Sequence, residues 1–255
     1  GESGVGKTEI SKIIADIYRN MGFLKNKKFI VAKRDNFVAG YLGQTAIKTQ
    51  KLLESCIGGV LFIDEAYSLG NNEGKDSFAK EAIDTIRSAQ NKGFKIYAET
   101  CPQYLFLKKD DLNKDDFEGA KYICSPPPRD PENQKYVWRG IQNGTFNVLS
   151  SDHAPFNFDD KKGKMLKGKK TPFKHVPNGV PGIETRLTLL LSEGVMKKKI
   201  SINKFVEVTS TNPAKIFGLY PKKGTIAIGS DADIVIWDTD IDSTITNNEL
   251  HHDTD

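Results

Sequence analysis

Apolar residues recur at helical and strand-like spacing through the first third of the chain. A first helix is predicted by apolar residues three or four positions apart, namely Ile10, Ile13, Ile14, Ile17 and Met21. Two short apolar runs follow at residues 29–32 and 60–63, and a helical pattern over residues 45–57 separates them. Continuous apolar runs of this length are typical of strands buried on both faces, so the two runs are expected to pair in a parallel sheet.

The same alternation continues beyond residue 80, which places the whole chain in the α/β class. A helix is predicted over residues 80–93, a strand over residues 94–99, and a second short strand that leads into Asp152. An amphipathic helix is expected after the prolines at 126–128.

The last part of the pattern is a helical stretch followed by a strand. Residues 201–219 read as helical, with a break at Pro213, where Asn212 can cap the helix that follows. An apolar run at residues 234–237 predicts a strand in an antiparallel or mixed element.

Composition narrows the classes of partner. The formal net charge is +4, and only six of the 37 basic residues are arginine, the side chain best suited to bidentate phosphate and base contacts. No nucleic-acid partner is therefore expected, and the lysine-rich residues 161–174 are interpreted as a solvated loop. The three cysteines form no C-x-x-C pair, which favours reduced thiols and a cytoplasmic location. No apolar run approaches ~20 residues, so no membrane partner is expected.

The chain opens on a glycine-rich pattern that is typical of phosphate binding. Its Gly1-x4-Gly6-Lys7-Thr8 spacing matches the phosphate loop, whose backbone N–H groups surround an anion at the start of a helix. The nucleotide-binding candidates are Gly4, Val5, Gly6, Lys7, Thr8 and Asp64. Thr8 and Asp64 would hold Mg²⁺, and Glu65 would polarise the attacking water as a catalytic residue.

This first piece closely resembles the CbxX-type AAA+ ATPases, the group that includes a bacterial rubisco activase. The resemblance rests on GESGVGKT, FVAGYLGQTAIKT, GGVLFIDEAYSL and FAKEAIDTI, and it covers residues 1–86. It implies part of a P-loop parallel sheet, with ATP and Mg²⁺ as cofactors, in a hexameric ring that remodels a protein partner. Tyr41 falls where such rings carry a pore loop, although a surface or packing tyrosine is the expectation outside a ring.

The second piece, residues 87–255, resembles the dihydropyrimidinase/hydantoinase family of cyclic amidohydrolases. AETCPQYLFL, CSPPPRDPENQ, SSDHAPF and VPNGVPGIETRL carry this resemblance, and GTIAIGSDADIVIWD resembles the return of the chain to the family's β-sandwich. The resemblance implies the C-terminal part of a (β/α)8 barrel and a tetrameric parent. It also implies two zinc ions whose hydroxide opens a small cyclic amide ring.

Single residues carry over from this resemblance. Asp152 matches the catalytic proton shuttle and zinc ligand, and Ser125 and Asn178 match positions whose backbone groups orient the substrate amides. His153 is interpreted as a histidine that packs in the fold or supports a metal ligand from behind, and Glu184 with Arg186 as a helix-start pair.

The zinc site is expected to be incomplete. The chain has four histidines, and none lies in the H-x-H pair from which the family's first ligands come. No strand precedes the phosphate loop, and neither the ATPase's sensor nor the barrel's first strands lie where each would be needed. We therefore expect two partial sequences joined near residues 81–93.

Three functions remain open at this point. The chain could be a metal-dependent hydrolase of cyclic amides, an ATP-driven remodeller, or a non-catalytic fusion or misjoined product in which both sites are incomplete. One structural expectation concerns the junction. Residues 95–98 could extend the first sheet beside residues 60–63 and bring Glu99 or Thr100 near the γ-phosphate, with ATP hydrolysis close to background because three carboxylates would repel the triphosphate.

Overall fold

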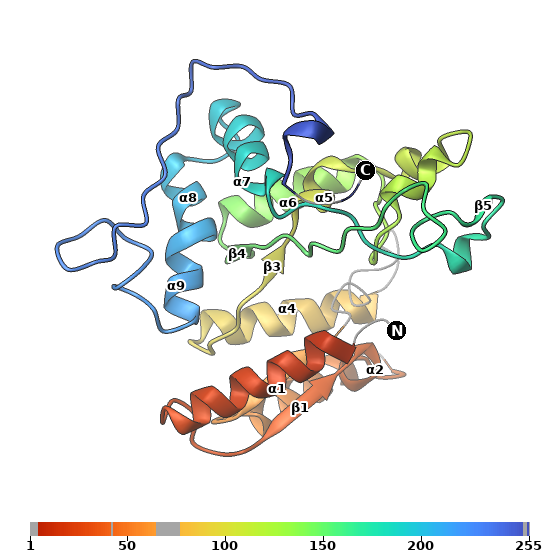
Figure 1. The fold of residues 1–255 in the computed structure, drawn as a ribbon. Coiled ribbons are helices and arrows are strands. Elements are labelled where there is room, and N and C mark those ends of the chain that lie inside the picture. The colour runs from red at the N-terminus through yellow and green to blue at the C-terminus, as the bar shows by residue number, and fades with distance from the viewer. Residues whose placement is uncertain (1–4, 42, 65–76, 252–253, 255) are drawn as a thin grey trace. The chain divides into compact units, whose positions relative to one another are not determined.

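The computed structural model describes residues 5–41, 43–64, 77–251 and 254 (Figure 1). The chain divides into two compact units, residues 1–96 and residues 97–255, and each is described by itself. Among the described residues, no helix is both long and apolar enough to cross a lipid bilayer.

The first unit is built on one pair of parallel strands. Its elements are α1 (Val5–Asn20), β1 (Phe29–Ala32), α2 (Arg34–Phe37), α3 (Gln44–Ser55), β2 (Val60–Ile63) and α4 (Ser77–Asn91). The register pairs Phe29 with Val60 and Ala32 with Ile63, which confirms the pairing predicted from the two apolar runs.

The core of the first unit is small. Ala32, Phe37 and Ala82 are fully buried, and apolar side chains from α3, β2 and α4 pack against them. The predicted helix at the start of the chain is present as α1, but Ile10, Ile13 and Ile17 are about half exposed. Helical periodicity therefore predicted the element correctly, whereas the depth of its burial depends on neighbours that the periodicity does not specify.

The second unit consists of short helices around another parallel pair. Its principal elements are β3 (Glu99–Thr100), α5 (Pro102–Phe106), α6 (Glu132–Gln142), β4 (Val148–Leu149), α7 (Thr185–Leu190), α8 (Ile202–Val206) and α9 (Asn212–Ile216). Shorter elements are η2 (Lys109–Asn113), η3 (Glu118–Tyr122), β5 (Leu166–Lys169), η4 (Phe173–His175), η5 (Leu191–Met196), η6 (Glu207–Thr211) and η7 (Asn247–Glu249). The main core contains buried side chains from α5, α6, β4, α7 and α8.

The expected extension of the first sheet across the junction is wrong. Residues 95–98 form no strand, and β3 pairs with β4 while β2 pairs with β1. The carbonyl of Ala98 accepts the N–H of Asn147 at 2.8 Å, and the Asn147 side-chain oxygen accepts the N–H of Ala98 at 3.0 Å. These bonds fix the segment to β4, so Glu99 and Thr100 belong to the second unit.

The predicted helix break at Pro213 is also corrected. The π-helical segment η6 joins α8 directly to α9, so the helical backbone continues through Pro213 and does not break there. The Asn212 side chain donates to the carbonyl of Asn147 at 2.9 Å rather than capping a helix.

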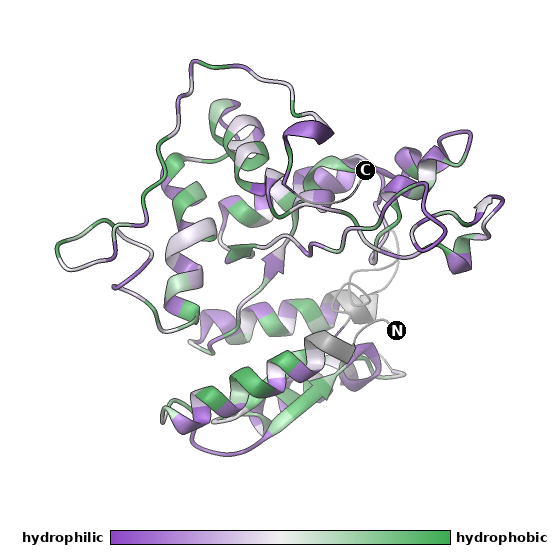
Figure 2. Cartoon of the chain, viewed as in Figure 1, coloured by the Kyte–Doolittle hydropathy of each residue, from purple (hydrophilic) through white to green (hydrophobic). Residues whose placement is uncertain are grey.

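The expected strand at residues 234–237 is absent from the described chain. A strand needs a neighbour for its backbone hydrogen bonds, and no described segment pairs with this one. Ile234 and Ile236 are 61% and 90% exposed, while Trp237 packs edge-on against Phe205 of α8. Figure 2 shows hydrophobic positions along this extended segment after α9. Four of the five described strands form two separate parallel pairs, β1 with β2 and β3 with β4, rather than a closed barrel.

Candidate active site

The candidate site begins at the carboxyl end of β4. The strand is held by the N–H of Ser150, which donates to the Thr100 carbonyl at 2.9 Å, and by the Arg186 guanidinium, which donates to the Leu149 carbonyl at 3.0 Å. Asp152 follows with φ of 45°, a left-handed backbone that aspartate tolerates better than most residues. This conformation turns the chain sharply where the strand ends, and the Asp152 side chain is partly exposed there.

His153 has a packing role, as predicted. Its backbone forms a parallel bridge with Val180, and its Nδ1 accepts N–H groups from Gly182 at 3.1 Å and from Ile183 at 3.3 Å. In a neutral ring the proton therefore lies on Nε2. The histidine joins the segment after Asp152 to the turn that precedes α7.

The segments that carry Ser125 and Asn178 are hydrogen-bonded to each other. The N–H of Gly179 donates to the carbonyl of Ile123 at 3.0 Å, and both Ser125 and Asn178 are exposed. Gly179 also lies against the segment after Asp152: a Cβ built on it would meet the Ala154 carbonyl oxygen at 2.3 Å. The structure thus brings together the three segments that carry the predicted residues.

A buried lysine lies behind this convergence. Lys164 is only 3% exposed, and its Nζ donates to the carbonyls of Ile123 at 3.1 Å, Pro177 at 3.1 Å and Gly179 at 2.7 Å. The prediction of a solvated loop over residues 161–174 is therefore wrong at this position, although most other lysines of the loop are exposed. Nothing in the local sequence distinguishes Lys164, because its acceptors come from segments distant along the chain.

Burial perturbs several titratable groups around the lysine. It lowers the pKa of Lys164 to about 8, and the nearby Cys124 thiol opposes this shift. It raises the pKa of Cys124 to about 11, with Asp152 adding to the rise and Lys164 opposing it. The pKa of Tyr104 is raised well above its usual range by burial, and further by the charges of Cys124, Cys101 and Asp152. Sequence reasoning assigned no role to Tyr104, Cys124 or Lys164.

The stability of the second unit is expected to rise between pH 8 and pH 9. The folded Lys164 loses its proton near pH 8, whereas the unfolded side chain keeps it to about pH 10.5, so the unfolded state binds more protons in this interval. The gain is on the order of 1 kcal/mol per pH unit. Above pH 9 the unfolded Cys124 ionises while the folded thiol keeps its proton to about pH 11, which offsets the contribution of Lys164, so the rise levels off.

Urea unfolding at a series of pH values tests this prediction. Both tryptophans, Trp138 and Trp237, belong to the second unit, so their fluorescence reports on that unit. Lys164→Met should abolish the rise, and Lys161→Met, at an exposed position of the same loop, should keep it. A wild-type stability that falls steadily from pH 8 would contradict the assignment.

Glu184 and Arg186 lie at the start of α7, as predicted: Glu184 is the N-cap residue and Arg186 lies in the first turn. Arg186 donates to the Leu149 carbonyl, and burial lowers the pKa of its guanidinium. Glu184 accepts the backbone N–H of His251 at 2.8 Å and faces the His251 Nδ1 at 2.6 Å, which raises the pKa of that histidine. Each residue therefore fixes a different segment to the start of α7.

The phosphate-loop candidates are described only in part. Gly4 and Glu65 lie outside the described residues, and Val5, Gly6 and Lys7 are described only as backbone of α1. Asp64 follows β2, and its carboxylate lies 3.9 Å from the Lys33 Nζ. Tyr41 is 74% exposed, in line with a surface tyrosine. The nucleotide site itself stays a prediction.

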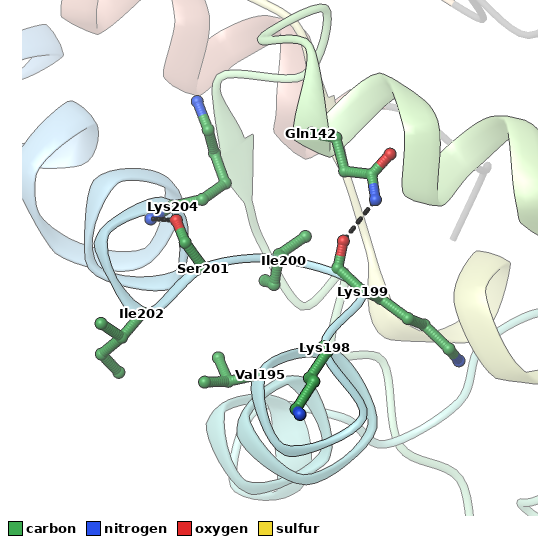
Figure 3. A pocket seen from close by; sticks show the side chains of 8 residues that line it. All are labelled: Gln142, Val195, Lys198, Lys199, Ile200, Ser201, Ile202 and Lys204. Carbon is green, nitrogen blue, oxygen red and sulfur yellow. Dashed lines mark hydrogen bonds between the residues drawn. The ribbon is translucent and has the colours of Figure 1, made fainter.

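In the part of the chain that the structure describes, no cluster of possible metal ligands marks the predicted chemistry, and the pocket found there lies elsewhere. Within the described ranges, no three His, Cys, Asp or Glu side chains gather where they could hold a metal ion. A pocket of about 550 Å³ lies at the junction of η5 and α8 and is lined by Gln142, Val195, Lys198, Lys199, Ile200, Ser201, Ile202 and Lys204 (Figure 3). It contains none of the residues predicted from the sequence.

Two different protein families match the two parts of the chain. The family described as "ATPase family associated with various cellular activities" matches residues 1–96, and the amidohydrolase family matches residues 80–253. Over 173 residues, or 68% of the chain, it is 43% identical to a D-hydantoinase from Rhizobium radiobacter. Over 172 residues it is 47% identical to a D-hydantoinase from Geobacillus stearothermophilus.

Solved structures agree with this relationship. A dihydropyrimidinase from Brevibacillus agri is similar over 88% of this chain and 44% of its own, with a TM-score of 0.57 and 36% identity. A D-hydantoinase structure is similar over 97% of this chain and 61% of its own, with a TM-score of 0.68 and 29% identity. The chain spans only 37% and 36% of the two curated D-hydantoinases. Because the family match covers most of its length, the chain belongs to the amidohydrolase family.

Proposed function

We propose that residues 87–255 are the C-terminal part of a D-hydantoinase-like cyclic amide hydrolase, preceded by an AAA ATPase segment over residues 1–86. The observation that carries the first assignment is the convergence of the segments of Ser125, Asp152 and Asn178 around Gly179. The names of the similar proteins, D-hydantoinase and dihydropyrimidinase, support a cyclic amide as the ligand class. In a whole protein of this kind, these segments would line the carboxyl end of a (β/α)8 barrel.

Each residue has a distinct proposed role. Backbone groups at Ser125 and Asn178, both exposed, would orient the amide groups of a small ring by hydrogen bonds. In a whole hydrolase of this kind, the Asp152 carboxylate at the end of β4 would accept a proton from the attacking water and return it to the departing ring nitrogen. Its partly exposed position allows contact with both ligand and water.

The described residues do not fit a zinc centre. Asp152 is the one predicted zinc ligand among them, and no group of three possible ligands occurs in the described chain. The Nδ1 of the neighbouring His153 is already occupied by two backbone N–H groups. We therefore derive no step through zinc, and we propose that this chain recognises the ring without opening it by itself.

A second candidate function belongs to the first unit. The AAA family match over residues 1–96 and the parallel β1–β2 pair, which ends in Asp64, favour ATP binding with Mg²⁺ held at Thr8 and Asp64. Glu65 would orient the attacking water, and the proposed parents of the two parts are a hexamer and a tetramer. Lys7→Ala should abolish binding of a fluorescent ATP analogue, and equal binding by wild type and variant would rule this function out.

Recognition of the ring is tested by titration of the ¹⁵N-labelled full chain with hydantoin. We expect the amide resonance of Asn178 to shift, and Asn178→Pro, which removes the backbone donor, to weaken binding at least tenfold. Asn178→Ala keeps the N–H and should bind normally. Ring opening should be absent with or without added zinc.

Two results would count against this proposal. Unchanged amide resonances at saturating hydantoin would remove the assignment of the binding site. Zinc-dependent ring opening by the purified chain would show that its ligand set is complete, contrary to the donor set described above.

A further inference from the structure

Lys164 connects the loop after Asp152 to both segments of the proposed ligand site. Its backbone N–H donates to the carbonyl of Asn157 at 2.9 Å, and a Cβ on the preceding Gly163 would meet the same carbonyl oxygen at 2.0 Å. The lysine backbone is thus fixed against the segment that follows Asp152. From there its side chain reaches the carbonyls of Ile123, Pro177 and Gly179.

Two of these three acceptors flank Asn178. The carbonyl of Pro177 belongs to the same peptide unit as the N–H of Asn178, and the bond between them is trans. In a trans peptide the N–H points opposite to the C=O, so the hydrogen bond from Lys164 directs the Asn178 N–H away from the ammonium group. Within the described residues this N–H donates to no acceptor. It is therefore an oriented donor that is open to a ligand.

The positive charge also affects the donor strength of that peptide. An ammonium group bound to a carbonyl oxygen draws electron density through the amide and makes the opposite N–H a stronger donor. An apolar side chain could fill the same buried space without the cost of removing a charge from water. What the ammonium group supplies, and an apolar side chain cannot, is the three charge-assisted hydrogen bonds to these carbonyls.

We propose that Lys164 is a positioning residue that aims and polarises the Asn178 N–H and holds the Ser125 segment beside it. This inference rests on the proposed function, because Asn178 and Ser125 are the groups assigned to the ring amides. It adds to that function a residue that reaches the ligand only through a peptide unit. It also explains why a lysine-rich loop contains one fully buried member.

Amide hydrogen exchange of the full chain tests the proposal without any ligand. The probe is the Gly179 N–H, which donates to the Ile123 carbonyl. Lys164 also donates to this carbonyl, so loss of the lysine should loosen the bond that protects the probe. Lys164→Met should raise its exchange rate at least tenfold. Lys164→Arg, which keeps the charge and the N–H donors, should restore most of the protection, and the exposed-site control Lys161→Met should match the wild type.

The outcomes separate a positioning role from a general core role. Unchanged exchange of Gly179 in Lys164→Met would overturn the proposal. An equal rise in the exchange rates of Gly179 and of buried α6 amides such as Ile141, in both Lys164 variants, would also overturn it. The lysine would then support the whole core rather than this one site. Lys164→Met should also weaken hydantoin binding about tenfold relative to Lys164→Arg. If the wild type itself fails to bind hydantoin, the proposed function fails, and the exchange rates still decide the role of Lys164.

Discussion

Replacing Gly179 with alanine is expected to lower the free energy of unfolding of the second unit by about 3 kcal/mol. Two costs combine at this position. The backbone φ of Gly179 is 152°, a region that side-chain-bearing residues rarely adopt, and the new Cβ would lie 2.3 Å from the Ala154 carbonyl oxygen. Because that oxygen belongs to a backbone fixed by the bridge at His153, the clash can be relieved only by moving the segment after Asp152.

The matched control for this substitution is Gly168→Ala. Gly168 also has a positive φ, 63°, but a Cβ added there would meet no other atom within 4 Å. Its replacement should cost only about 1 kcal/mol, the penalty of the left-handed conformation alone. Urea unfolding followed by tryptophan fluorescence measures both variants. Equal losses for the two glycines would show that the contact with Ala154 does not determine the cost.

Truncation of Leu149 to alanine is expected to cost about 3 kcal/mol. Leu149 lies in β4, three residues before Asp152, and is only 1% exposed within the main core of the second unit. Removing three carbon atoms there loses their burial and leaves a cavity that a fixed strand cannot fill. The strand is held on both sides. The N–H of Ser150 donates to the Thr100 carbonyl, and the carbonyl of Leu149 accepts from Arg186.

The control for Leu149 is Leu166→Ala, at a position in β5 that is 42% exposed. That change should alter the free energy of unfolding by no more than about 0.5 kcal/mol. The Leu149 variant should also broaden or shift the amide resonance of Asp152, since the strand determines where that residue lies. A loss below about 1 kcal/mol for Leu149→Ala would mean that the core closes around the missing atoms.

The sequence predicted an element correctly where the pattern of apolar residues within that element is enough to determine its structure. The two apolar runs of the first unit predicted the parallel pair correctly. The burial on both faces expected for such runs is incomplete, because Val31 is 37% exposed and every residue of β2 is only partly buried. The helix after the three prolines is present as α6, since its apolar positions repeat at helical spacing. The packing role of His153 was also predicted, and its Nδ1 contacts supply the detail.

Local pattern failed where a distant partner decides the outcome. Residues 94–99 look like a strand, but no pattern within them reveals that Asn147 holds Ala98 beside β4. Lys164 resembles its solvated neighbours, and only the carbonyls of segments on either side of it explain its burial. The domain boundary at residue 86 stays a prediction, because the two family matches overlap over residues 80–96. The roles of the site residues also stay predictions, because they depend on a ligand.

The extended segment after α9 has a consequence for handling the purified chain. Ile234, Val235 and Ile236 form a β-prone run without charge, and each is more than 60% exposed. Such a run, outside any sheet, offers both apolar side chains and backbone groups to the same run of another molecule. Self-association should therefore increase steeply with concentration and begin at this segment, so a charged residue at Val235 would extend the concentration range over which the chain stays monodisperse.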